Sequence, residues 1–260
     1  MIKINGHEVL LDSFGDGTLK CDCLRQETVV PQAQDSHVNI LWCYDNDSEL
    51  FALRCIVDYI KSRYPFVVCE LTMPYIPNAR QDRYVSDRIF TLKSFANIIN
   101  QMGFAAVFVY DPHSDVSPAL IDRCFPIQSA FEFTVDKDTV MMYPDTGAAK
   151  KYGSGDSSAI IGNKHRNAEG RIDAYELINF TPGTKKVVIR DDICSYGGTF
   201  AAAARELRRR GVEEIVLVVT HCENNIFKGE VLDYVDAVFT TDSIFTGRHP
   251  QVHIARHFRA

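Results

Sequence analysis

Short apolar runs alternate with amphipathic stretches in the first half of the chain. Residues 38–44 form an apolar run of the length typical of a buried strand, and the apolar residues of 47–63 recur at helical spacing. The same order of strand, helix and strand continues through residues 66–73, 91–102 and 105–110. This βαβαβ pattern predicts a parallel sheet covered by helices.

A second cycle of the same kind predicts a second, related half. Residues 2–20 do not follow this strand–helix pattern. They consist of short alternating segments around a Gly-Asp-Gly turn, which is typical of a hairpin. The predicted fold class is α/β, with two tandem domains, residues 1–132 and 133–260, each with a mainly parallel sheet flanked by helices. In the second domain the expected strands are residues 139–143, 159–162, 186–190, 215–220, 237–240 and 252–255, and the expected helix is 200–210.

Charge and composition narrow the range of partners. The chain has 260 residues, with 28 Lys and Arg against 34 Asp and Glu, and a net charge of −6. This balance argues against sequence-independent nucleic-acid binding, which requires a broad cationic face. We expect no membrane partner either, because the apolar runs are too short to cross a bilayer and residues 1–10 do not read as an export signal. The eight cysteines include no CxxC pair, so we expect reduced thiols in a cytoplasmic protein.

The sharpest chemical signal follows the apolar run 186–190. The run ends in Asp191 and Asp192, and a loop of small residues then leads into the expected helix. Adjacent glycines let the backbone approach a phosphate, and a helix N-terminus offers N–H donors to it. The carboxylates of Asp191 and Asp192 are suited to binding ribose hydroxyls or a divalent cation. The alternative is a tight turn, capped by Asp and Thr, without a ligand. The candidate sugar-phosphate residues in the loop are Ser195, Tyr196, Gly197, Gly198 and Thr199.

This loop resembles the phosphoribosyl diphosphate (PRPP) loop of the type I phosphoribosyltransferase fold, and a second segment narrows the family. Residues 74–83 read PYIPNARQDR, which resembles the PY-x-x-x-ARQDR segment of ribose-phosphate diphosphokinases (PRPP synthetases). The guanidinium forks of Arg80 and Arg83 suit nucleotide phosphates. The resemblance implies that Arg80, Gln81, Asp82 and Arg83 bind ATP.

Four further segments fall in the order of that family. Residues 111–114 resemble its D-x-H-S segment, which implies that His113 contacts metal and the ATP phosphates. Residues 144–147 resemble its P-D-x-G turn, which implies that Asp145 contacts Mg²⁺. Residues 162–166 resemble a mobile catalytic segment that carries a Lys and an Arg, here Lys164 and Arg166. Residues 14–17 resemble a hairpin that reaches the ATP of a neighbouring subunit, which implies roles for Phe14 and Asp16, although Thr18 replaces the family's Glu.

Taken together, the resemblance implies an Mg²⁺-dependent enzyme that moves the β,γ-diphosphate of ATP to the anomeric hydroxyl of ribose 5-phosphate. It also implies a homo-oligomer, a dimer or larger. The loops around residues 80 and 197 are then expected to converge on one cleft, with the loop 145–163 closing over it. We expect residues 152–157 to form a flexible loop within this segment.

The PRPP loop departs from the family pattern at two positions. Ser195 and Tyr196 stand where the family has Asp and Thr. The bulky Tyr196 could crowd a terminal phosphate or stack on a group attached to it. One hypothesis is therefore that the acceptor is a 5-substituted ribose phosphate such as ADP-ribose. The alternative is tolerated drift in an enzyme that uses ribose 5-phosphate.

Two other functions remain open. A PRPP-consuming phosphoribosyltransferase shares the loop at residues 191–199 but has no need of residues 79–83 or His113. A catalytically silent regulatory subunit would be expected to lack the Lys164 and Arg166 pair, which is present here. His221-Cys222-Glu223 resembles the H-x-E of zinc deaminases, but the PCxxC that such a site requires does not follow it.

Overall fold

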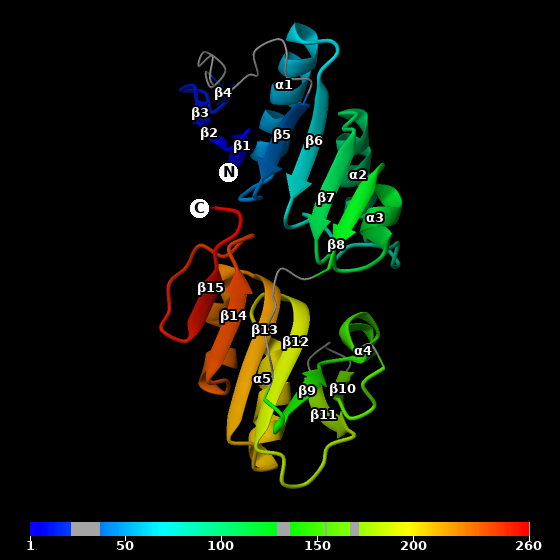
Figure 1. The fold of residues 1–260 in the computed structure, drawn as a ribbon, viewed down its shortest axis with the longest axis vertical. Helices are drawn as coiled ribbons and strands as arrows, with labels where there is room; N and C mark the ends of the chain where they lie inside the picture. The colour runs from blue at the N-terminus through cyan, green and yellow to red at the C-terminus, as the bar shows by residue number, and fades with distance from the viewer. Residues whose placement is uncertain (22–36, 129–135, 154, 167–171, 260) are drawn as a thin grey trace. The chain divides into compact units, whose positions relative to one another are not determined.

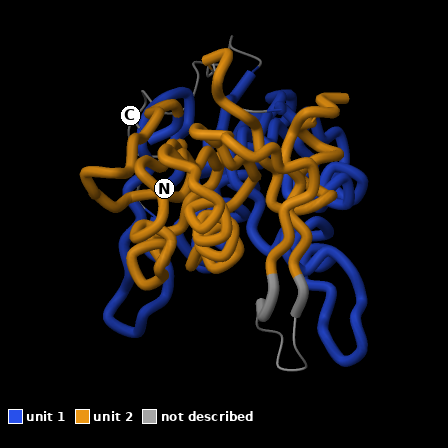
Figure 2. The backbone as a smooth tube through the Cα atoms, turned by 90° about the horizontal axis from the view of Figure 1, so that it is seen from below, with its two compact units in different colours: residues 1–130, 258–260 blue, residues 131–257 orange. Residues whose placement is uncertain are grey.

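The chain is divided into two compact units. One unit comprises residues 1–130 with 258–260, and the other comprises residues 131–257 (Figure 2). The computed structural model describes residues 1–21, 37–128, 136–153, 155–166 and 172–259, with only the backbone described at 165–166 and 172–174.

Unit 1 is built around a six-stranded sheet with the order β2-β1-β5-β6-β7-β8 (Figure 1). The pairs β5–β6, β6–β7 and β7–β8 are parallel, whereas β1 pairs antiparallel with both β2 and β5. Its strands are β1 (Ile2–Ile4), β2 (His7–Val9), β5 (His37–Trp42), β6 (Val68–Met73), β7 (Ala106–Tyr110) and β8 (Cys124–Ile127), and its helices are α1 (Ser48–Arg63), α2 (Thr91–Gln101) and α3 (Val116–Leu120). The predicted parallel sheet with flanking helices is confirmed.

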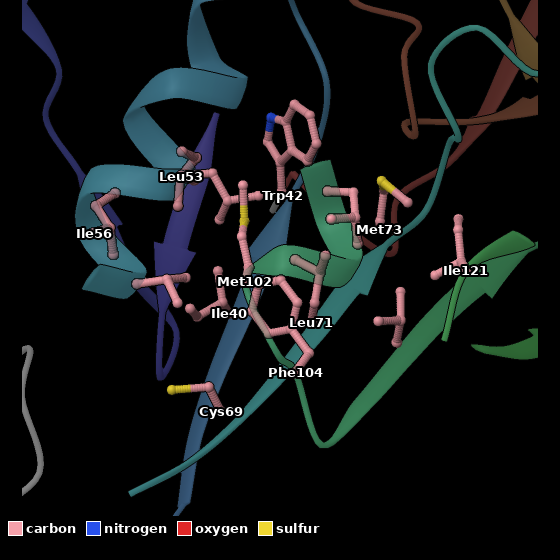
Figure 3. Close-up of a cluster of buried hydrophobic side chains, with 14 of the residues drawn as sticks. Ile40, Trp42, Leu53, Ile56, Cys69, Leu71, Met73, Met102, Phe104 and Ile121 are labelled. Atoms are coloured by element: carbon pink, nitrogen blue, oxygen red, sulfur yellow. The ribbon is translucent and has the colours of Figure 1, made fainter. Parts of the chain in front are cut away.

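The core of unit 1 lies between the sheet and its helices. On α1, Leu53, Ile56 and Ile60 recur at helical spacing, and all three are buried against the sheet. The fully buried Trp42 donates its indole N–H to Glu49 at the start of α1, over 3.0 Å. A buried Trp is costly unless its N–H has an acceptor, and Glu49 supplies one. Other buried side chains of this core are Ile40, Cys69, Leu71, Met73, Met102, Phe104 and Ile121 (Figure 3).

Unit 2 is built around a seven-stranded sheet with the order β11-β10-β9-β12-β13-β14-β15 (Figure 1). All its neighbouring pairs are parallel except β10–β11. The buried face of α5 consists of Phe200, Ala201, Ala203, Ala204 and Leu207, which join the core of the sheet. The strands are β9 (Thr139–Tyr143), β10 (Ile160–Arg166), β11 (Ile172–Ile178), β12 (Lys186–Cys194), β13 (Glu214–Cys222), β14 (Ala237–Thr241) and β15 (Val252–Ala255), and the α-helices are α4 (Thr146–Tyr152) and α5 (Gly198–Arg209).

The prediction of a loop over residues 145–163 is wrong for most of that range. Helix α4 occupies Thr146–Tyr152, and strand β10 begins at Ile160. The segment 162–166, which resembles a mobile catalytic segment, forms part of β10 and pairs antiparallel with β11. Both differences arise because short helices and edge ribbons are stabilised by tertiary partners more than by local periodicity. Strands β8 and β11 and helix α3 also have no counterpart in the sequence-based prediction.

Both ends of the chain belong to unit 1. The predicted hairpin over residues 2–20 is confirmed and consists of two hairpins, β1–β2 and β3 (Asp12–Ser13) with β4 (Leu19–Lys20). The last residues were predicted to belong to the second domain, but they are part of unit 1. The ring of Phe258 contacts Tyr110 with centroids 4.8 Å apart, and Arg259 donates to Asp45 over 2.7 Å.

Candidate functional site

In unit 1 the candidate residues follow two neighbouring strands. The ARQDR segment follows β6, and residues 111–114 follow β7, which is parallel to β6. The carboxyl ends of parallel strands meet at one edge of a sheet, so the two segments lie together. Asn78 and Asp111 turn the chain there with φ of 64° and 45°, a left-handed conformation that Asn and Asp tolerate better than most residues. The hydroxyl of Ser114 donates to Asp82 Oδ2 over 2.8 Å and joins the segments.

The carboxylate of Asp82 is the centre of this cluster. Its side chain is buried, and it accepts hydrogen bonds from Ser114 and from Arg83 Nε, the latter over 2.8 Å. Burial opposes its ionisation, but these hydrogen bonds and the charges of Arg83 and His113 hold the pKa of Asp82 below its usual value. The Arg83 side chain is 75% exposed. Asp82, expected to contact ATP, therefore sits where it orients the exposed guanidinium of Arg83.

The other candidate residues of unit 1 are exposed. Arg80, Gln81 and His113 all have exposed side chains around the Asp82 cluster. The side-chain oxygen of Gln81 accepts from the hydroxyl of Thr91 over 2.8 Å, at the start of α2. The cluster thus presents two guanidinium groups, an amide and an imidazole to solvent, which is a suitable set for a polyanion.

The hairpin β3–β4 carries the remaining candidates of unit 1. Phe14 is 56% exposed, a large fraction for an aromatic ring. Asp16 accepts from the backbone N–H and the hydroxyl of Thr18 over 3.0 and 2.7 Å, which lowers the pKa of Asp16. These bonds within the turn hold the exposed ring of Phe14 at the tip of a defined hairpin.

In unit 2 the expected phosphate loop joins β12 to α5. Gly197 has φ of 75°, a left-handed conformation that favours glycine, and an added Cβ would lie 2.6 Å from Val231 Cγ1. Helix α5 starts at the next residue, and no side chain described in the structure caps its N-terminus. Its first N–H groups are therefore suited to an anion. Thr199 lies in the first turn of α5, and Tyr196 is 54% exposed beside it.

Asp191 and Asp192 lie near the carboxyl end of β12, with two residues between them and the start of the loop. Asp192 is 5% exposed, and its N–H donates to Asp191 Oδ1 over 2.9 Å. Burial and the neighbouring charge of Asp192 raise the pKa of Asp191. Carboxyl oxygens accept hydrogen bonds, and ribose hydroxyls can donate them. The pair is therefore suited to the vicinal hydroxyls of a ribose.

Asp145 and Lys164 form an ion pair between the start of α4 and β10. Asp145 Oδ1 accepts from the N–H of Ala148 over 3.0 Å, and Oδ2 accepts from Lys164 Nζ over 3.0 Å. Burial opposes its ionisation, but the N–H of Ala148 and the ammonium of Lys164 hold the pKa of Asp145 below its usual value. Arg166 lies in β10, but its side chain is outside the described residues.

Sequence reasoning missed the partner of Ser195. The Ser195 hydroxyl donates to Glu223 Oε2 over 2.5 Å, and Asn225 Nδ2 donates to the same oxygen over 3.0 Å. Glu223 directly follows β13, the parallel neighbour of β12. An acid immediately after the strand next to the loop was the available signal, because parallel neighbours end at the same edge.

A metal ion would have to be held by few protein ligands. Within the parts of the chain that the structure describes, no group of three or more His, Cys, Asp or Glu could hold a metal ion. Mg²⁺ is commonly bound through one or two carboxylates together with waters and substrate phosphates. Asp145 is suited to binding Mg²⁺ in this way, because its carboxylate already forms an ion pair with a cation, the ammonium of Lys164. Among the described helices, none has both the length and the apolar character needed to span a membrane.

Known proteins resemble the chain along most of its length. The model of a family described as "Phosphoribosyl transferase domain" matches residues 143–255, which lie in unit 2. A ribose-phosphate pyrophosphokinase of Vibrio cholerae is 30% identical, over 78% of this chain and 69% of that relative. One of Helicobacter hepaticus is 24% identical, over 93% of this chain and 87% of that relative. These matches extend well beyond the phosphoribosyltransferase segment.

The fold also has a solved counterpart. The crystal structure of a phosphoribosylpyrophosphate synthetase from Mycobacterium smegmatis matches with a TM-score of 0.75. The match covers 96% of this chain and 86% of that chain, at 19% sequence identity. Both sheets with their flanking helices therefore have a counterpart in a known enzyme fold.

Proposed function

Because the chain belongs to the ribose-phosphate pyrophosphokinase family of transferases, we propose that it transfers the β,γ-diphosphoryl group of ATP to the anomeric hydroxyl of a ribose 5-phosphate moiety. The acceptor is either ribose 5-phosphate, giving PRPP, or a 5-substituted ribose phosphate such as ADP-ribose. One observation carries this proposal. The carboxyl pair Asp191 and Asp192 is followed, after four residues, by a left-handed glycine, Gly197, at the N-terminus of α5, an order that suits ribose hydroxyls followed by a phosphate.

The transfer is an in-line displacement in which the acceptor supplies the nucleophile. The anomeric oxygen attacks the β-phosphorus, the bond from that phosphorus to the α,β-bridging oxygen breaks, AMP leaves, and the hydroxyl proton passes to solvent. Such reactions depend on positioning and on neutralising charge. Lys164 and Arg166 stabilise the transferring group. Asp191 and Asp192 hold the ribose, and residues 195–199 hold the 5-phosphate.

ATP is assigned to the residues of unit 1. The exposed guanidinium groups of Arg80 and Arg83 bind its phosphates, with Asp82 orienting Arg83. Mg²⁺ bound with the nucleotide would supply neutralisation of the phosphate charges. The residues proposed to hold the metal ion are His113 and Asp145.

The activity is tested with purified protein, ATP, Mg²⁺ and either ribose 5-phosphate or ADP-ribose. AMP release should require one of the acceptors and should stop when EDTA removes the metal. Phosphorus NMR should show an intact diphosphate attached to the acceptor. AMP release at the same rate without any acceptor would contradict the proposal. Recovery of the β- and γ-phosphates only as orthophosphate would contradict it as well.

A further inference from the structure

The feature that carries a further inference is the carboxylate of Glu223 beside the phosphate loop. It accepts the hydroxyl hydrogen of Ser195 over 2.5 Å and an amide hydrogen of Asn225 over 3.0 Å. The sheet itself sets this contact. Cys194 and Cys222 are partners in the parallel pair β12–β13, and the N–H of Glu223 donates to the carbonyl of Cys194 over 2.8 Å.

The backbone that carries Glu223 is anchored to the loop and to the rest of unit 2. An added Cβ on Gly229 would lie 1.8 Å from the carbonyl oxygen of Tyr196, so the two backbones are in close contact. Asn224 Oδ1 accepts the N–H groups of Thr246 and Gly247 over 3.2 and 2.9 Å. With its backbone held on both sides, the Glu223 side chain stays next to the loop.

This contact changes what the loop can bind. A serine hydroxyl has a single hydrogen, and Ser195 gives that hydrogen to Glu223 rather than to a ligand. An ionised carboxylate has no hydrogen to donate, and it repels a phosphate in proportion to the phosphate's charge. A phosphate monoester carries a charge of about −1.5 to −2 at pH 7. A phosphate whose second linkage is to a further group, as an ester or an anhydride, carries only one negative charge of its own, so it meets about half of this repulsion.

We infer that Glu223 determines acceptor specificity, so that the loop accepts a ribose whose 5-phosphate carries a further substituent and disfavours ribose 5-phosphate. This inference rests on the proposed function and narrows its acceptor. The ring of Tyr196, 54% exposed beside the loop, is available to pack against the substituent carried by that phosphate. The acceptor class is thus a 5-substituted ribose phosphate, for which ADP-ribose is the probe.

The test compares the wild-type chain with Glu223→Gln and with a matched control, Glu214→Gln. Glu214 is the first residue of β13, at the end opposite Glu223, and its exposed carboxylate pairs with Lys186. Both substitutions remove one negative charge. The glutamine oxygen at position 223 can still accept from Ser195.

AMP release is measured over a range of concentrations of each acceptor. For the wild type we expect kcat/KM to be at least about tenfold higher with ADP-ribose than with ribose 5-phosphate. Glu223→Gln should raise kcat/KM for ribose 5-phosphate about tenfold, equivalent to about 1.4 kcal/mol, mainly through KM. Its value for ADP-ribose should stay within about threefold, and Glu214→Gln should match the wild type.

A wild-type preference for ribose 5-phosphate would overturn the inference, as would an acceptor ratio in Glu223→Gln equal to that of the control. Absence of AMP release with both acceptors in every protein would instead contradict the proposed function. In that case calorimetric titration with ribose 5-phosphate decides, because the inference still requires tighter binding to Glu223→Gln than to the control. If Glu223→Gln unfolds, Glu223→Ala must show the same shift in preference, and an unshifted preference there overturns the inference.

Discussion

Asp82 and Asp145 each hold a cationic side chain of the candidate site in a defined place. Asp82 accepts from Arg83 and Asp145 accepts from Lys164, and both acids have lowered pKa values. Each acid is also fixed from a second side, Asp82 by Ser114 and Asp145 by the N–H of Ala148. The cations are therefore positioned before a ligand arrives, which reduces the entropy lost when they bind it.

Lys164→Ala is the residue-scale test of the catalytic assignment. Removing one preorganised charge from the transition state should lower kcat for AMP release by about 10²- to 10³-fold. Lys186→Ala is the matched control, because Lys186 also pairs with an acid, Glu214, at the opposite end of the sheet. Equal turnover in the two variants would remove Lys164 from the mechanism.

Gly229→Ala tests the contact between the loop and the segment after β13. The added Cβ would lie 1.8 Å from the carbonyl oxygen of Tyr196, so the loop must move. We expect the free energy of unfolding to fall by about 1–3 kcal/mol, the usual cost of overpacking. The KM for the acceptor should rise while the KM for ATP, assigned to unit 1, stays constant. An unchanged KM for the acceptor would show that this contact does not position the loop.

At the scale of elements, parallel strand pairs bring distant candidate residues together. The pair β6–β7 places Asp82 beside Ser114, and the pair β12–β13 places Ser195 beside Glu223. In both cases the interacting residues follow the carboxyl ends of neighbouring strands. The chemistry of the site thus depends on strand order as much as on the motifs.

Helix α5 provides a pH prediction. Near its C-terminus Glu206 accepts from Arg209 and Arg210, and the hydrogen bond from Arg209 is the main cause that lowers the pKa of Glu206 from 4.5 to about 2. A folded-state pKa below the unfolded value stabilises the fold above pH 4.5, and this contribution is lost as the pH falls toward 2.

Comparison of the wild type with Glu206→Gln measures that contribution. The variant should be less stable at pH 7 by about 1 kcal/mol, the scale of surface ion pairs. The difference in the free energy of unfolding should shrink steadily as the pH is lowered toward 2. A difference that does not depend on pH would show that Glu206 acts through packing instead of charge.

The elements that were predicted correctly are those whose own residues carry the pattern. In α1 and α5 the apolar positions recur at helical spacing, and β12 and β13 contain the apolar runs 187–189 and 215–219. The short helix α4 and the edge strand β11 lack such a signal, because their stability comes from contacts with the rest of unit 2.

At the scale of the whole molecule, the chain consists of two units that each have a core of their own. Among the residues that the structure describes, a cluster of buried side chains from the sheet, α1 and α2 forms the main core of unit 1, and unit 2 has a separate cluster around β12, β13 and α5. The family model matches within unit 2, whereas the pyrophosphokinase relatives match across both units. The proposed division of labour, with ATP at unit 1 and the acceptor at unit 2, follows this organisation.

A whole-molecule prediction concerns the hairpin β3–β4. We propose that its exposed Phe14 completes the ATP site of a neighbouring subunit in a dimer or a larger homo-oligomer. Phe14→Ala should then lose about tenfold or more in activity, since stacking on a base is worth about 1–3 kcal/mol. Co-expressed Phe14→Ala and Lys164→Ala chains should regain about a quarter of wild-type activity, because each mixed dimer contains one intact site.

The matched control for this experiment mixes Lys164→Ala with Asp191→Asn. Both changes affect unit 2, so no mixed dimer contains an intact site. The molar mass of the wild type in solution, measured by light scattering, must also exceed that of one chain. A monomer, or equal recovery in both mixtures, would contradict the proposed subunit crossing.

The sequence by itself determined the two-part α/β organisation, the parallel sheets and the candidate segments for the chemistry, because these follow from local periodicity and from contiguous motifs. Only the tertiary structure decided which of those residues meet. Ser195 and Glu223 are 28 residues apart, Asp82 and Ser114 are 32 apart, and Asp145 and Lys164 are 19 apart. Strand order and register set these contacts, and both depend on packing across the whole sheet, which no local pattern records.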